Sequence, residues 1–139
     1  MTTTTASRAL PAGVLLAAGI VVAILANTVV SLAAVAAGAS ATYPPLTIWV
    51  YGAFTVAGVL VGYLGWRLNR HAPARLRVLV PTVLVLSFIP DIAALVIGFI
   101  PGTTTTGVVA LTIMHLTTAA VALPVYSRLA PAGSSARRA

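Results

Sequence analysis

Apolar residues run along this chain in four long blocks separated by short polar connections. The blocks cover residues 10–35, 46–66, 78–100 and 107–127. A bilayer core about 30 Å thick takes about 20 helical residues at about 1.5 Å each, so each block can cross it as a helix. Lipid requires backbone groups to bond internally, and alternating strands of about ten residues are missing from the pattern. The pattern therefore predicts an all-α integral membrane four-helix bundle.

The composition excludes a water-soluble protein. Of the 139 residues, 60% are hydrophobic and only 6% are charged, and the mean hydropathy is +1.08. Soluble domains carry about 25% charged residues, and a chain this short cannot hide so much apolar surface from water. The four blocks use most of the chain, so we expect one transmembrane domain over residues 1–139 with short polar tails.

The charges predict an orientation. The basic residues precede the first block, lie between the second and third, or follow the fourth: Arg8, Arg67, Arg70, Arg75, Arg77, Arg128, Arg137 and Arg138. The connections 36–45 and 101–106 carry none. Because basic residues favour the cytoplasmic side, we expect both termini to be cytoplasmic in a multi-pass protein of the inner cell membrane.

The arginines do not indicate a nucleic-acid partner, since they are few and form no broad basic face. The connection 67–77 can instead hold anionic membrane lipid, besides fixing the topology. The chain has no cysteine, so thiolate metal sites and disulfides are excluded. We expect no cofactor and no metal.

The first block has a second interpretation, as a cleaved signal peptide. Arg8, an apolar run and the small residues 38–41 imitate the parts of such a peptide. The uncharged run 9–41 is, however, far longer than the usual apolar region of about 7–15 residues. We therefore favour a first helix that is retained.

Two ionisable side chains, Asp91 and His115, lie inside the blocks, near mid-depth and slightly toward the outer side. Such residues are expensive in a bilayer and usually face the bundle interior. Burial disfavours both charges, so a neutral pair and an ion pair can be close in energy. We therefore interpret Asp91 and His115 as a proton-handling pair that shares one proton, and as the candidate catalytic residues if the protein is an enzyme.

Three further polar residues are candidate ligand-binding groups near that pair: Asn27, Tyr51 and Ser87. Pro90 is expected to kink the third helix, and Ser87 to help satisfy the backbone that the kink frees. The alternative role of such residues is interhelical hydrogen bonding. A metal site of Asp91, His115 and Asn27 would have too few strong ligands.

Small and aromatic residues indicate how the helices pack. Gly58 and Gly62 share one face, which we expect to pack within the bundle; a homo-oligomer contact is the alternative. The aromatic residues near the block ends are expected to form belts at the two interfaces, with Tyr43, Trp49 and Tyr51 outside and Tyr63, Trp66 and Tyr126 inside.

The chain resembles the small four-helix membrane proteins of GC-rich actinobacteria that form an uncharacterised family of unknown function. The resemblance covers nearly the whole chain and rests on Asn27, on the third-block segment Ser87-Phe-Ile-Pro90-Asp91, and on Met114-His115-Leu116 followed by Pro124. It implies the four-helix fold and no activity.

Three functions remain open on these residues. The first is an accessory or structural membrane subunit, in a homo-oligomer or a larger complex. The second is a proton-linked carrier of a small or lipophilic molecule. The third is an intramembrane acid/base enzyme acting on a lipid or isoprenoid-like substrate. We rank them in that order, because one acid and one histidine are few groups for a complete catalytic cycle.

Overall fold

The computed structural model describes residues 11–131, and these form an all-α four-helix bundle. The elements are α1 (Ala12–Ala36), a short 3-10 helix η1 (Pro44–Leu46), α2 (Ile48–Asn69), α3 (Pro73–Leu86), α4 (Ile89–Ile97) and α5 (Thr105–Leu129). With α3 and α4 taken as one interrupted span, Pro73–Ile97, four helices are long and apolar enough to cross a membrane. This confirms the predicted fold class.

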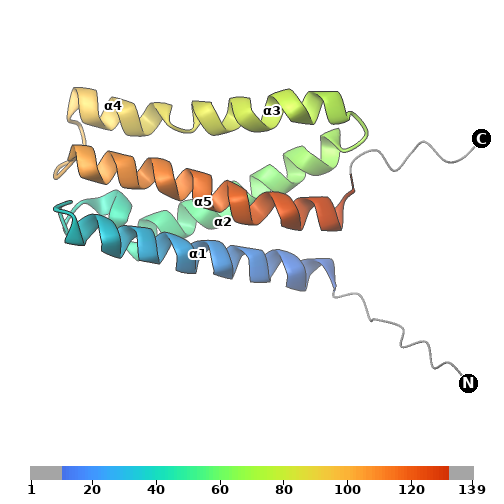
Figure 1. The fold of residues 1–139 in the computed structure, drawn as a ribbon, viewed down its shortest axis with the longest axis horizontal. Coiled ribbons are helices and arrows are strands. Elements are labelled where there is room, and N and C mark those ends of the chain that lie inside the picture. The colour runs from blue at the N-terminus through green and yellow to red at the C-terminus, as the bar shows by residue number, and fades with distance from the viewer. Residues whose placement is uncertain (1–10, 132–139) are drawn as a thin grey trace, which may run out of the picture.

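The helices run lengthwise beside one another, with α5 in the middle. Figure 1 shows α3 and α4 along one side of α5 and α1 along the other, with α2 running obliquely behind them. Accordingly α5 contacts all four other α-helices. Both ends of the described chain and the α2–α3 turn lie at one end of the bundle, and the other two connections lie at the opposite end (Figure 1).

The arginines of the described chain belong to the end of the bundle that holds the α2–α3 turn. They lie in the last turns of α2 and α5, in the turn itself and at the start of α3: Arg67, Arg70, Arg75, Arg77 and Arg128. The expectations for Arg8, Arg137, Arg138 and the two polar tails fall outside the described residues.

The outer surface of the bundle is apolar and the inside holds aromatic and polar groups. Leu25, Val29 and Phe54 are each more than half exposed, as helices facing lipid require. Inside, Tyr43 is fully buried, and Tyr126 packs in a second cluster toward the arginine-rich end. Both clusters include buried side chains of α5, among them Met114 and Tyr126.

The third span departs most from its predicted form. It begins at Pro73, because proline suits the first turn of a helix. The arginines that follow are polar, yet they belong to the first turns of this helix. It ends at Ile97, where Gly98 adopts the left-handed conformation (φ 68°) and caps α4. The predicted limits, 78–100, followed hydropathy alone and are wrong by several residues at the start.

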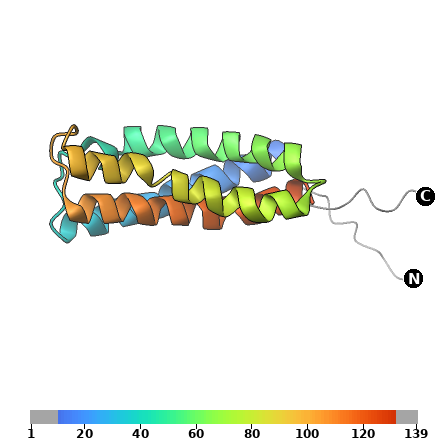
Figure 2. The same ribbon diagram turned by 90° about the horizontal axis from the view of Figure 1, so that it is seen from above.

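The expected kink at Pro90 is a full interruption of the helix, visible between α3 and α4 in Figure 2. Pro90 has no backbone N–H, so the carbonyl of Leu86 receives no helical hydrogen bond from it. The Ser87 hydroxyl donates to the carbonyl of Leu84 (2.6 Å), not to that of Leu86. The carbonyl of Leu84 is itself freed at the interruption, because the Phe88 N–H donates to the carbonyl of Val85 (3.1 Å), so Ser87 does help to satisfy the freed backbone.

Other helix limits shift by smaller amounts. α5 begins at Thr105 instead of residue 107, because the Thr104 side chain caps it by accepting from the Gly107 N–H (3.0 Å). α2 continues to Asn69 instead of ending at residue 66, and the Asn69 amide donates to the carbonyl of Gly65 (2.9 Å). Hydropathy assigns these polar residues to the connections, but in the structure they cap or extend the helices.

Candidate functional site

Asp91 and His115 meet at the seam between α4 and α5. Asp91 lies in the first turn of α4, directly after the interruption, and His115 lies near the middle of α5. Their nearest atoms, Asp91 Oδ2 and His115 Nδ1, are 3.4 Å apart. The helix interruption thus positions a carboxyl group against the one histidine of the four spans.

The hydrogen bond of His115 fixes where its ring carries a proton. His115 Nδ1 lies 2.8 Å from the carbonyl oxygen of Leu111. A carbonyl oxygen only accepts, so Nδ1 must carry the hydrogen and Nε2 is the acceptor of the neutral ring. The carboxyl of Asp91 therefore faces a nitrogen that is already protonated.

The proton shared between the two side chains stays a prediction, and this geometry limits the path that such a proton could take. Asp91 Oδ2 is within ion-pair distance of Nδ1, yet it is buried and makes no hydrogen bond within residues 11–131. The short distance does not make a hydrogen bond, because the hydrogen on Nδ1 points to the carbonyl of Leu111 and not to Asp91. A proton leaving Asp91 would have to reach Nε2, on the other side of the ring.

The pair is only partly enclosed. The Asp91 side chain is 12% exposed, whereas that of His115 is 35% exposed. The Phe88 ring lies edge-on to the imidazole, with ring centroids 5.9 Å apart and planes at 88°. One edge of His115 therefore stays accessible from outside the bundle at a depth near the middle of its helix.

Asn27 belongs to a separate polar cluster that ties three helices together. It is 1% exposed, and its Nδ2 donates to Thr55 Oγ1 on α2 (3.1 Å) and to Thr118 Oγ1 on α5 (3.0 Å). Its Oδ1 is buried and has no hydrogen-bond partner in the described chain. Thr118 follows His115 by three residues, so the two clusters lie about one turn apart along α5.

Tyr51 hydrogen-bonds a residue outside the pair. Its hydroxyl lies 2.7 Å from that of Thr28, which also donates to the carbonyl of Ile24 (2.9 Å). Next to it, the Ser31 hydroxyl donates to the carbonyl of Leu46 (2.7 Å). Of the five predicted site residues, the structure brings Asp91 and His115 into contact, and it engages Asn27, Tyr51 and Ser87 in other hydrogen bonds.

The expectation of interfacial belts is wrong for three of the tyrosines. Tyr43, Tyr51 and Tyr126 are at most 7% exposed, while Trp49 is 85% exposed. Tyr126 donates to the carbonyl of Val59 (2.6 Å) and so joins α5 to α2. Sequence position at the end of a block gives a side chain's depth but not the direction in which it points.

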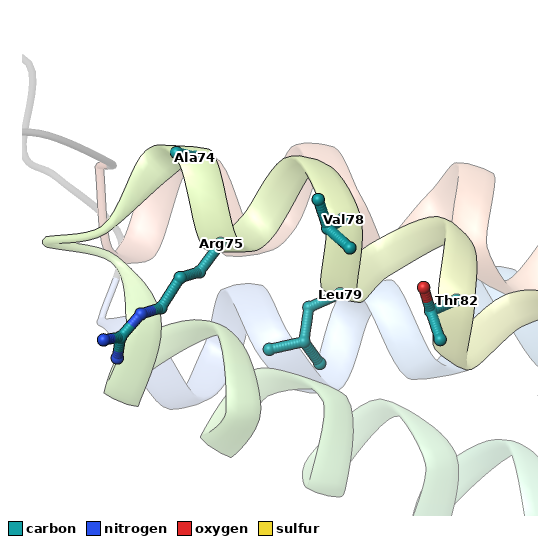
Figure 3. Close-up of a pocket in the computed structure, with 5 residues that line it drawn as sticks. All are labelled: Ala74, Arg75, Val78, Leu79 and Thr82. Carbon is teal, nitrogen blue, oxygen red and sulfur yellow. The ribbon is translucent and has the colours of Figure 1, made fainter.

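The described residues do not gather ligands for a metal ion beside the pair. Within residues 11–131 no three histidine, cysteine or acidic side chains group closely enough for a metal ion. A hollow of about 450 Å³ lies on α3, in the other half of the third span from Asp91, and is shown in Figure 3.

Comparisons of the chain with family models, with characterised proteins and with solved structures find no match.

Proposed function

We propose that the protein is an accessory subunit of an assembly in the inner cell membrane, and that the seam between α4 and α5 is where it meets its partner. The observation that carries the proposal is His115: an ionisable ring, 35% exposed, two residues from the midpoint of the span Thr105–Leu129. A polar group at that depth is costly when it faces lipid and favourable when another helix supplies a hydrogen-bond partner.

The contrast with the other polar side chains supports this proposal. Asn27, Tyr51 and Tyr126 are nearly buried, and each joins two or more helices of the same bundle. They stabilise the subunit. His115 differs because its free acceptor, Nε2, belongs to a ring with an exposed edge. That atom can accept a hydrogen bond from a serine, threonine or asparagine of a neighbouring helix.

The proposed orientation follows from the arginines. The five in the described chain lie at one end of the bundle, which the positive-inside rule assigns to the cytoplasm. Both termini are then cytoplasmic, and the Asp91–His115 pair lies toward the outer half of the membrane. The partner's recognition group would have to lie at the same depth.

The test is co-purification from native membranes in a mild detergent, comparing His115→Leu with His71→Gln. His71 is the other histidine, and it lies in the α2–α3 turn. We expect a stoichiometric partner, either another protein or a second tagged copy, that His115→Leu loses and His71→Gln keeps. Equal recovery from both variants, or a monomer from wild-type membranes, would contradict the proposal.

A second candidate is a proton-linked carrier, which one observation favours. The third span is interrupted directly before Asp91, and transporters often build their binding sites at interrupted helices. A carrier predicts substrate uptake into proteoliposomes that is driven by a pH gradient and lost in Asp91→Asn. An accessory subunit predicts no such uptake by the purified protein.

A further inference from the structure

An open apolar hollow lies along exposed residues of α3, near the arginine-rich end of the bundle. It has a volume of about 450 Å³ and is lined by Ala74, Arg75, Val78, Leu79 and Thr82. Figure 3 shows Arg75 and Leu79 extending from α3 toward α2.

The hollow has a positively charged end and an apolar wall, which follow one another along the helix. Arg75 stands at the end next to the α2–α3 turn, while Val78 and Leu79, 67% and 40% exposed, present an apolar wall farther in. The span Pro73–Ile97 has 25 residues, or about 37 Å of helix, against a hydrocarbon core of about 30 Å. The start of α3 therefore reaches the headgroup level, and the rest of the hollow lies beside acyl chains.

The guanidinium group of Arg75 has no acidic side chain to pair with in this protein. The whole chain contains one acid, Asp91, and that side chain contacts His115 on the far side of the helix interruption. Arg67, Arg70 and Arg77 lie in the same part of the sequence and add positive charge there. An anion from outside the chain is the complementary partner of this end of the hollow.

We propose that this hollow binds one anionic phospholipid, with the phosphate group on Arg75 and an acyl chain along Val78 and Leu79. Charge complementarity selects the headgroup, and the apolar wall behind Arg75 accommodates the attached chain. The site is independent of the proposed role of the Asp91–His115 seam, and it does not depend on which end of the bundle is cytoplasmic.

The experiment is native mass spectrometry of the full chain after reconstitution with equal amounts of phosphatidylglycerol and phosphatidylcholine. We expect one phosphatidylglycerol retained per protein and no selective retention of phosphatidylcholine. R75Q should lower that retention about fivefold, the factor for one arginine at an anionic surface. R128Q removes the same charge from α5, outside the hollow, and should leave retention unchanged.

A second pair of variants tests the apolar half of the site without changing charge. V78F fills the hollow, and V61F adds the same ring at an exposed position of α2. Because both positions face outward, both variants should keep the helical content measured by circular dichroism. We expect V78F to abolish the retained lipid and V61F to preserve it. Equal losses in R75Q and R128Q, retention unaffected by V78F, or no preference for phosphatidylglycerol would each overturn the proposal.

Discussion

The hydroxyl of Tyr126 donates a 2.6 Å hydrogen bond to the carbonyl oxygen of Val59, and it passes close to Gly62 in reaching that atom. A Cβ at residue 62 would lie 2.7 Å from the Tyr126 hydroxyl oxygen. The same ring packs against Tyr63 and Trp66, with centroids 5.7 and 6.1 Å away. Tyr126 thus connects α2 and α5 at the arginine-rich end.

Gly62→Ala should therefore destabilise the bundle by about 1–3 kcal/mol, the usual range for overpacking. Gly58→Ala is the matched control in the same helix, because a Cβ there has no atom within 4 Å. Thermal unfolding in detergent, followed by circular dichroism, measures both changes. Tyr126→Phe should relieve part of the effect of Gly62→Ala by removing the hydroxyl, so the double variant should be less destabilised than the sum of the single variants. Equal stability of the two glycine variants would show that Tyr126 does not approach α2 so closely.

The hydrogen bonds of Asn27 give a second prediction about stability. Thr118→Val removes one acceptor of the Asn27 amide, and we expect a loss of about 0.6 kcal/mol, the average for interhelical hydrogen bonds in membranes. Thr117→Val is the control, because that hydroxyl donates only to the carbonyl of Ile113 in its own helix (2.8 Å). Asn27→Leu should cost more than Thr118→Val, since it breaks bonds to both neighbouring helices. Unfolding curves in which Thr117→Val is as damaging as Thr118→Val would contradict the assignment.

The contact between Asp91 and His115 predicts energetic coupling. In a double-mutant cycle of Asp91→Asn and His115→Gln, the two effects on unfolding should fail to add by about 0.5 kcal/mol or more. The cycle of Asp91→Asn with His71→Gln should be additive, because His71 lies in the turn at the opposite end of the third span. Additivity in both cycles would mean that the 3.4 Å contact contributes nothing to stability.

The sequence predicted the number and type of the spans because lipid exposure makes hydropathy a direct signal of membrane helices. It could not predict the helix ends. Arg75 and Arg77 are helical although they are charged, and Gly98 ends α4 through its backbone conformation, before the apolar run itself ends. Hydropathy reports the preferred solvent of a residue, whereas helix ends depend on caps and backbone angles.

The candidate site was predicted by residue type and only partly by position. Asp91 and His115 stood out because ionisable residues are rare in membrane spans. Depth along a helix also suggested Asn27 and Tyr51, yet these face Thr55, Thr118 and Thr28. Which helix a side chain faces depends on how the helices rotate and cross. The sequence does not reveal that rotation, because lipid-facing and buried positions are similarly hydrophobic. Thr55 and Tyr126 were therefore missed as partners.

The orientation is tested with introduced cysteines, since the chain has none of its own. Thr42→Cys lies in the α1–α2 connection and Ala72→Cys in the α2–α3 turn, at opposite ends of the bundle. In intact cells an impermeant thiol reagent should label Thr42→Cys and should reach Ala72→Cys only after the cells are opened. The reverse labelling pattern would place the arginines outside the cytoplasm and contradict the positive-inside assignment.

Site-directed photo-crosslinking in native membranes tests the docking seam most directly. A benzophenone amino acid at Ile92, next to Asp91 on α4 and 54% exposed, samples the seam. The same group at Val29, 67% exposed on α1, samples a face with no ionisable residue. We predict one discrete crosslinked protein species from Ile92 that is absent from Val29 and lost when His115→Leu is added. The proposal is contradicted if Ile92 gives no crosslinked protein, or if the products from both positions are the same.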